Sequence, residues 1–230
     1  MRPSHLLPLI LLTSLGLAAF SGCAGKPVDE TDPAALYEEA NQEIASDHYQ
    51  VAVEKLRAIK NKFPYSKYAT EAQLRIADVY FLQESYGEAA IAYESFRDLH
   101  PKHEKVPYAM FRVAKSYYSD NPGHIGRDQT PAAKALDAYG DFLRQFPAAP
   151  EAVEAQKDVK DIRNLLAQKE LYVANFYYHD GDHLAAQGRY NKILELFGDT
   201  ESAAIAKERL ASLEKDDRKK DDAKKDDAKK

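Results

Sequence analysis

Few residues of this chain have the type and spacing that chemistry requires. His179 and His183 lie four residues apart in the stretch HDGDH, a spacing at which two imidazoles on a helix can bind one metal ion. Gly181 lies between them and would break that helix, so we interpret the stretch as a turn in which Asp and Gly are favoured. We interpret His100 and His103 in HPKH as another turn. The sequence therefore predicts no metal site and no cofactor.

The motifs of common enzyme classes are also missing from the sequence. It contains no G-x-S-x-G nucleophile elbow and no glycine-rich phosphate loop, and its 10 glycines are scattered. The formal net charge is −5, with no basic stripe outside the C-terminal tail, which argues against nucleic acid as a partner. We therefore expect a binding protein that is not an enzyme.

The single cysteine, Cys23, directly follows an apolar leader. The apolar run over residues 6–20 is too short to span a bilayer, which takes about 20 apolar residues, and one thiol cannot form an intramolecular disulfide. The leader resembles a bacterial lipoprotein signal, so we expect residues 1–22 to be removed, Cys23 to carry lipid and residues 23–32 to act as a tether. Ala24, in place of an acidic retention residue, implies the periplasmic face of the outer membrane. The alternatives are an ordinary cleaved signal or a stray core cysteine.

Alanine recurs at a fixed position ahead of the turns that close the helical segments. Counting back twelve residues from the Pro or Gly in four such turns reaches an alanine every time, and large side chains follow four and seven positions later on the same helical face. A second set of alanines lies in the preceding helix of each unit. The two sets are Ala52, Ala89, Ala135 and Ala186, and Ala40, Ala77, Ala114 and Ala174. Small residues at such points let paired helices approach closely, as in the tetratricopeptide repeat.

We therefore predict an all-α fold, a tetratricopeptide-repeat α-solenoid of about five helical hairpins over residues 33–215. Two insertions interrupt the register. Residues 119–131 are rich in Asn, Pro, Gly and Asp, which indicates a long turn. The other insertion precedes Ala174 and keeps the helical spacing of apolar residues, so it predicts one extended helix from about 150 to 179.

Helix boundaries are indicated by capping residues and by a change in composition. Asp32 and Thr130, each followed by proline, predict helix starts, and Thr200 is a possible cap for a last helix over 202–215. Residues 216–230 repeat Asp-Asp and Lys-Lys pairs and contain no apolar residue larger than alanine. We predict that this tail is disordered or transiently helical; a basic arm for lipid head groups is the alternative.

One face of each first helix lies away from the alanine contacts and would line a concave groove. It comprises the positions one and four residues after the alanine and three and six before it. Aromatic residues alternating with Asn, Asp and Lys suit an extended peptide or a chain terminus. The candidate groove residues are Tyr37, Asn41, Leu74, Asp78, Phe81, Tyr108, Phe111, Lys115 and Tyr118. The alternative is that part of these aromatics pack between neighbouring repeats.

Two longer stretches carry a family resemblance together with the leader and the repeat skeleton. They are GRDQTPAAKA at 126–135 and LAQKELYVANFYYHDGDHLAAQGRYNKILELFGDT at 166–200. The chain resembles the BamD family, lipoproteins of the outer-membrane β-barrel assembly (BAM) complex, over nearly all of residues 20–214. Gly198 stands where proline is usual, and Phe20 where the leader usually has leucine.

This resemblance implies a scaffold that supports folding and insertion of outer-membrane proteins. The family's N-terminal repeats engage targeting signals of unfolded outer-membrane proteins, and its C-terminal repeats hold the periplasmic domain of BamA; other BAM lipoproteins are further candidate partners. By motif, an arginine that pairs with an acidic residue of BamA falls on Arg189. The alternative for Arg189 is a local pair with an acid such as Glu195. The runner-up function is a periplasmic repeat protein that coordinates peptidoglycan synthesis or the division machinery.

Overall fold

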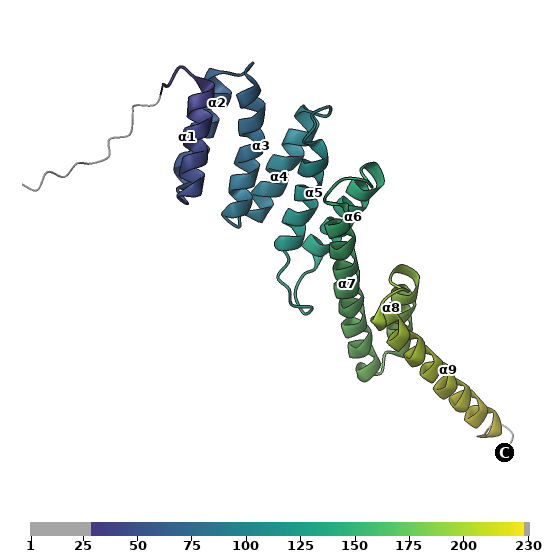
Figure 1. Cartoon of the computed structure of the whole chain (residues 1–230). Coiled ribbons are helices and arrows are strands. Elements are labelled where there is room, and N and C mark those ends of the chain that lie inside the picture. The colour runs from purple at the N-terminus through teal and green to yellow at the C-terminus, as the bar shows by residue number, and fades with distance from the viewer. Residues whose placement is uncertain (1–28, 228–230) are drawn as a thin grey trace, which may run out of the picture.

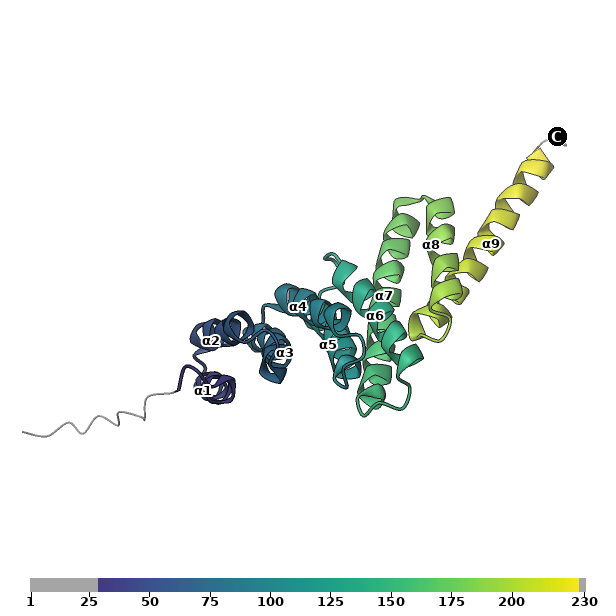
Figure 2. The same cartoon turned by 90° about the horizontal axis from the view of Figure 1, so that it is seen from above.

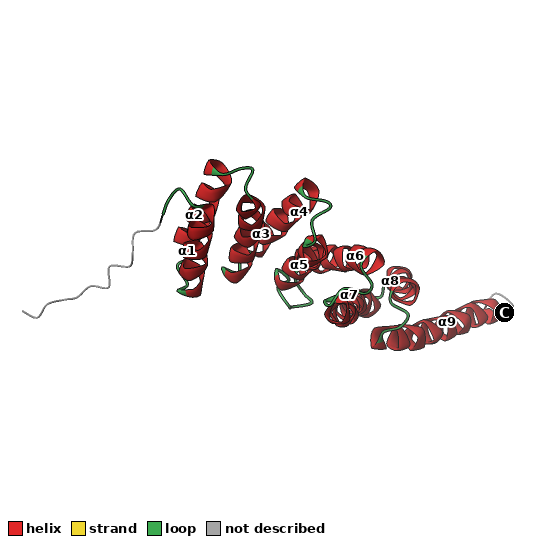
Figure 3. Cartoon of the chain, turned by 45° about the horizontal axis from the view of Figure 1, so that its top comes forward, coloured by secondary structure: helices red, strands yellow, loops and turns green. Residues whose placement is uncertain are grey.

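The computed structural model describes residues 29–227 of the chain. Cys23 and the rest of residues 1–28 lie outside the described residues, as do residues 228–230. Every regular element in the described range is a helix (Figure 3). The helices are α1 (Pro33–Ala45), α2 (Tyr49–Lys62), α3 (Lys67–Leu82), α4 (Tyr86–Leu99), α5 (Val106–Ser119), α6 (Thr130–Gln145), α7 (Ala152–Asp180), α8 (His183–Leu196) and α9 (Glu201–Asp227). The prediction of an all-α fold is confirmed.

Successive helices pair as antiparallel hairpins that stack side by side into an elongated array. The pairs are α1 with α2, α3 with α4, α5 with α6 and α7 with α8, and α9 packs on α8 and α7 (Figures 1 and 2). The described range thus contains four complete hairpins and one further helix, close to the five hairpins predicted. Within this range, no helix combines the length and the apolarity needed to cross a membrane.

The alanine register forms the centre of the core. All eight register alanines are completely buried, which lets the two helices of each hairpin lie close together. The large side chains four and seven residues after the second-helix alanines are completely buried as well. They are Leu56, Ile59, Tyr93, Phe96, Tyr139, Phe142, Tyr190 and Ile193. Each hairpin buries its apolar face against the next, as the tetratricopeptide register predicts.

The buried tyrosines of the second helices need an acceptor for their hydroxyl groups. Tyr93 donates to Asp78 at 2.7 Å and Tyr190 donates to Asn175 at 2.8 Å, and both acceptors lie one residue after the first-helix alanine. In the third hairpin that position is Lys115, whose ammonium group cannot accept a hydrogen bond. Tyr139 therefore donates to Asp158 of α7 at 2.6 Å. The third hairpin is tied to α7 by this exchange of acceptor.

Several predicted boundaries can be compared with the capping contacts. Asp32 accepts a hydrogen bond from the Ala34 amide at 2.9 Å and begins α1 as predicted. The prediction that Thr130 caps the next helix is wrong, because Thr130 is already the first helical residue of α6. Its amide donates a hydrogen bond to the Asp128 carboxylate at 3.1 Å. The side chain of Thr200 does not cap α9; it donates to the Phe197 carbonyl at 2.7 Å.

The predicted extended helix is present as α7, which is 29 residues long. It ends where Gly181 adopts φ +85°, a left-handed conformation that costs a residue with a side chain about 1 kcal/mol or more. Asp182 then accepts from the Ala185 amide at 3.0 Å and begins α8. The HDGDH stretch is therefore the turn between two helices, as the sequence predicts.

The C-terminal boundary differs from the prediction. The last helix does not end near residue 215 but continues as α9 to Asp227, so the tail is described as helix and not as disordered chain. Alanine, lysine and aspartate pairs four residues apart are compatible with an exposed helix. An ion pair with this spacing joins Arg218 to Glu214, 3.7 Å apart.

Candidate functional site

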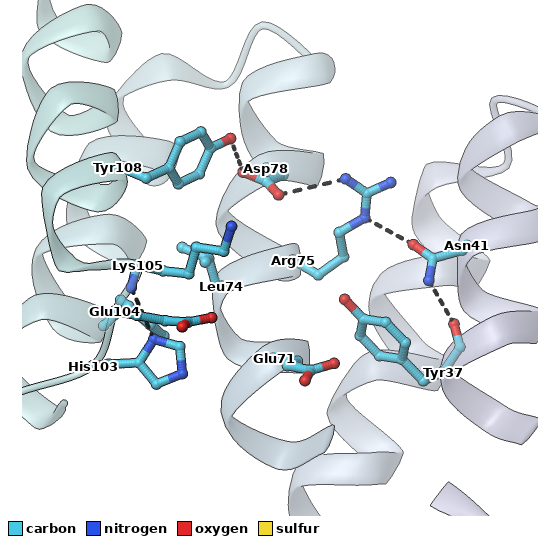
Figure 4. A pocket seen from close by; sticks show the side chains of 11 residues that line it. Tyr37, Asn41, Glu71, Leu74, Arg75, Asp78, His103, Glu104, Lys105 and Tyr108 are labelled. Atoms are coloured by element: carbon cyan, nitrogen blue, oxygen red, sulfur yellow. Dashed lines mark hydrogen bonds and ion pairs between the residues drawn. The ribbon is translucent and has the colours of Figure 1, made fainter. Parts of the chain in front are cut away.

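A cavity of about 380 Å³ opens between the first helices of the first three hairpins (Figure 4). Tyr37 and Asn41 reach it from α1, Leu74 and Asp78 from α3, and Tyr108 from α5. Glu71, Arg75, Phe96 and the α4–α5 turn complete the lining. The wall thus combines aromatic rings, one guanidinium and several carboxylates.

Asp78 is the hydrogen-bonding centre of this cavity. One of its oxygens accepts from the Tyr93 hydroxyl at 2.7 Å and from the Tyr108 hydroxyl at 2.8 Å. Burial, followed by the charge of Asp78, raises the pKa of Tyr108 to about 12 and raises that of Tyr93 further. Both tyrosines remain protonated donors at any physiological pH, so they hold the carboxylate and their own rings in fixed positions.

Arg75 connects α3 to α1 across the cavity floor. Its Nε donates to the Asn41 side-chain oxygen at 2.9 Å, and its guanidinium lies 3.4 Å from Asp78. Asn41 in turn donates to the Tyr37 carbonyl at 3.1 Å. Arg75 is half-buried with donors to spare, so it can hydrogen-bond a carbonyl or carboxylate that enters the cavity.

A second cavity, of about 470 Å³, adjoins the first. Glu104, Lys105 and Tyr108 line both cavities and therefore form the wall between them. The second cavity continues to the α6–α7 turn, where Phe146 and residues 147–150 line it. We call the two cavities together the groove. Its length and its mixture of apolar and polar walls suit an extended polypeptide.

The third hairpin departs from the predicted groove face. Phe111 is buried in the core, with its ring centroid 5.9 Å from that of Tyr139, so it is a packing residue and not a groove residue. Lys115 pairs with Glu154 and Asp158 of α7. Tyr118 packs against the apolar core that contains Phe111. The sequence could not show that α7 covers this face.

The other predicted groove residues divide into two groups. Tyr37, Asn41, Leu74, Asp78 and Tyr108 are brought together at the first cavity. Phe81 lies beside it, where its ring is covered by the Arg112 guanidinium at 3.7 Å. This cation–π contact leaves Phe81 unable to offer that face to a ligand.

Some lining residues were missed by the sequence analysis. Glu71 lies six residues before Ala77, a position that the helical wheel marks, so the register could have identified it. His103, Glu104 and Lys105 lie in a turn, where helical periodicity carries no signal.

Arg189 lies on a different surface, on the α7–α8 hairpin. It donates to Glu170 of α7 at 3.0 Å, and Lys192 donates to the other oxygen of the same carboxylate at 2.6 Å. Burial works to raise the pKa of Glu170, but the hydrogen bonds from Lys192 and Arg189 lower it overall. The local partner is therefore Glu170 and not Glu195. Arg189 keeps 40% of its side chain exposed and can still face a partner.

The histidine pairs take part in turn contacts. The His183 ring stacks on Tyr178 at 5.7 Å, and His103 accepts from the Lys105 amide at 3.1 Å. Among the described residues, no group of three or more His, Cys, Asp or Glu side chains is arranged to hold a metal ion.

Comparison with known proteins places this architecture in a family. The model of the YfiO family, described as outer membrane lipoprotein, matches residues 29–230. The chain belongs to the YfiO family. The resemblance to BamD is confirmed by relatives that carry that name. The chain is similar to the outer membrane protein assembly factor BamD of Neisseria gonorrhoeae, with 29% identity over 90% of this chain and 82% of that protein.

Two further comparisons give one more relative and one solved structure. The assembly factor BamD of Vibrio cholerae is 26% identical over 84% of this chain and 85% of its own length. Among solved structures, the chain is similar to a thermophilic TPR protein of Thermus thermophilus, with 16% identity and a TM-score of 0.40. The match covers 79% of this chain and 98% of that protein.

Proposed function

We propose that this chain is a scaffold lipoprotein of the BAM complex that receives unfolded outer-membrane proteins and holds them beside the BamA insertase. The observation that carries the proposal is the match of the YfiO family to residues 29–230, together with relatives named as outer membrane protein assembly factors. The chain spans more than four fifths of those two relatives.

The groove is our candidate site for the client. Tyr37, Leu74 and Tyr108 supply apolar surface, while Arg75 supplies donors for backbone or terminal oxygens. An unfolded β-barrel protein is extended and exposes alternating side chains, so a wall with separated apolar pockets can hold it without a fixed sequence. Binding of this kind needs no turnover and no cofactor.

Arg189 is our candidate for contact with BamA. Glu170, which also pairs with Lys192, holds the Arg189 guanidinium on the surface of the α7–α8 hairpin, which is the hairpin at the opposite end of the array from α1. The arrangement separates client capture from insertase binding. Because both sites lie on one scaffold, the captured client would meet the insertase at a raised effective concentration.

Lipid on Cys23 is our candidate for the membrane attachment. Each acyl CH₂ that enters the bilayer contributes about 0.8 kcal/mol, so several chains on one cysteine would hold the scaffold on the periplasmic face of the outer membrane. Replacing the leader and Cys23 by a cleavable secretory signal should release the protein to the periplasm, and unchanged fractionation with membranes would contradict the anchor.

Affinity purification from the native envelope, with co-purifying proteins identified by mass, tests the whole proposal. We expect BamA and unfolded outer-membrane proteins among the partners. Recovery of peptidoglycan enzymes without BamA would instead support the runner-up, a coordinator of cell-wall synthesis. None of the relatives reported above favours that runner-up.

A further inference from the structure

All turns that join one hairpin to the next lie on the same edge of the array, and the described chain begins there too. Because the helices alternate in direction, the start of α1 lies on the same side as the α2–α3 and α4–α5 turns (Figure 1). We call this side the upper edge; its segments include residues 29–32, 60–68, 99–105 and 146–151. The turns inside the hairpins lie on the opposite edge.

Two turns of the upper edge, residues 60–68 and 99–105, are basic although the chain as a whole is acidic, with a formal net charge of −5; residues 29–32 of the same edge carry the acids Asp29, Glu30 and Asp32. Around the α2–α3 turn, residues 60–68 contain Lys60, Lys62 and Lys67 and no Asp or Glu. The α4–α5 turn adds Lys102 and Lys105 against one acid, Glu104.

The other turns do not share this charge. The α6–α7 turn, residues 146–151, contains Glu151 and no Lys or Arg. The short turns on the opposite edge carry Asp47, Glu84, and Asp180 with Asp182. The positive charge of the upper edge is therefore concentrated at the α2–α3 and α4–α5 turns.

The α2–α3 turn also presents an aromatic side chain to solvent. Tyr65 is 101% exposed, the highest value among the large apolar side chains of the described residues. Lys67 lies over the neighbouring Tyr68 ring at 4.9 Å. Neither Lys60 nor Lys67 has a carboxylate within 4 Å among the described residues, whereas Lys62 is paired with Glu30 at 3.3 Å. Exposed tyrosine beside uncompensated lysine is the composition of a protein surface that meets lipid head groups.

The pair of Lys62 with Glu30 fixes where the chain leaves this surface. Glu30 is seven residues from Cys23, a stretch that spans at most about 25 Å when fully extended. Lipid on Cys23 would thus keep Glu30 within about that distance of the bilayer, and the ion pair brings the Lys62 end of the α2–α3 turn next to Glu30.

We propose that the α2–α3 turn is a second membrane contact, in which Lys60 and Lys67 bind an anionic bilayer surface and Tyr65 lies among the head groups. The proposal rests on the proposed function only for the lipid that brings this edge to the membrane. The contact would orient the scaffold, because a tether at one cysteine leaves rotation free and a second contact removes it.

Vesicle binding by the chain without its anchor tests the proposal. A chain of residues 24–230 keeps all the described contacts and lacks Cys23, so a failure of the lipid proposal cannot affect the result. We expect co-sedimentation with vesicles of phosphatidylethanolamine and phosphatidylglycerol, weaker binding to neutral phosphatidylcholine vesicles, and loss in 0.5 M salt, where screening shortens to roughly 4 Å.

Lysine substitutions then locate the contact. A lysine near an anionic surface contributes about fivefold to the partition constant, so Lys60→Gln with Lys67→Gln should lower binding roughly 25-fold. Tyr65→Ser should also lower binding to the anionic vesicles at low salt, because it removes the ring that lies among the head groups. The matched control is Lys157→Gln with Lys207→Gln, which removes two exposed lysines from α7 and α9.

The outcomes separate clearly. Loss confined to the first pair, with an unchanged circular dichroism spectrum, supports the contact. Equal binding to neutral and anionic vesicles, or equal loss in the control pair, overturns it. Client and BamA binding by the Lys60→Gln, Lys67→Gln chain should be unchanged in detergent, which keeps this test independent of the proposed function; loss of client binding there would place the lysines at the client site instead.

Discussion

Asp158→Ala is the substitution whose consequence the structure defines best. The Asp158 side chain is only 7% exposed, and it accepts from the Tyr139 hydroxyl at 2.6 Å and from Lys115 at 2.8 Å. These three residues belong to α7, α6 and α5. Removing the carboxylate therefore affects the joint between the third hairpin and the long helix.

The magnitude follows from what is left behind. Tyr139 is completely buried, so its hydroxyl would lose its acceptor at a cost of about 1–3 kcal/mol. Lys115 would lose one charge-assisted bond but keep Glu154 at 2.8 Å, which limits that loss to about 1 kcal/mol. We expect Asp158→Ala to lower the free energy of unfolding by about 2–4 kcal/mol. Tyr139→Phe removes a hydroxyl without stranding a partner and should cost about 1 kcal/mol.

Urea unfolding followed by circular dichroism measures these differences as shifts of the midpoint at constant slope. The double variant Asp158→Ala, Tyr139→Phe should cost about 1 kcal/mol less than the sum of the single variants, because no hydroxyl remains unsatisfied. Glu154→Ala, at a 53% exposed partner of the same lysine, is the control and should cost less than about 1 kcal/mol. Strict additivity, or a loss for Asp158→Ala no larger than that of the control, would refute the reasoning.

Three further predictions concern the α7–α8 hairpin. Arg189→Glu, which places a carboxylate beside Glu170, should abolish co-purification of BamA without changing the helical signal, whereas Lys192→Ala should retain it; normal association of the first variant would reject this role for Arg189. The pKa of Glu170 lies below its ordinary 4.5, so the stability that its ion pairs contribute is present above that value and is lost as pH falls through the lowered pKa. Glu170→Gln should therefore show a smaller decrease in Tm than the unmodified chain when the pH is lowered below about 4.5. Equal decreases in thermal melts would contradict the ion pairs. Gly181→Ala should lower stability by about 1 kcal/mol because of φ +85°, while Gly188→Ala, in open space within α8, should raise it by up to about 1 kcal/mol; the same sign for both in urea melts would count against the turn geometry.

Much of the fold could be predicted from the sequence because the repeat is short-range. Ala77 and Ala89, for example, lie twelve residues apart in adjacent helices, and their burial needs only the helical period and one turn. The extended α7 also follows from the unbroken spacing of its apolar residues. Such features depend on neighbours in sequence, which periodicity records.

The groove was only partly predictable because it depends on how hairpins stack. Tyr108 and Phe111 lie on the same predicted face, yet Tyr108 lines the groove and Phe111 is buried, since its ring packs against Tyr139 and Phe142 of α6. Lys115 lies outside the groove because it pairs with Glu154 and Asp158 of α7, which are distant from it in sequence. Lys105, in a turn, could be placed only by the structure. For the tail, the sequence left disorder and a transient helix as alternatives, and it could not fix the helix end at Asp227 because the charged repeat has no apolar face to give a periodic signal.

The central claim is that unfolded outer-membrane proteins occupy the groove, and site-specific photocrosslinking in living cells tests it most directly. A crosslinking amino acid at Tyr37 or Tyr108 should capture newly exported outer-membrane proteins, and the same group at Ile91, which is 67% exposed on α4 and lines neither cavity of the groove, should not. Equal capture at all three positions, or capture at Ile91 alone, would contradict the account.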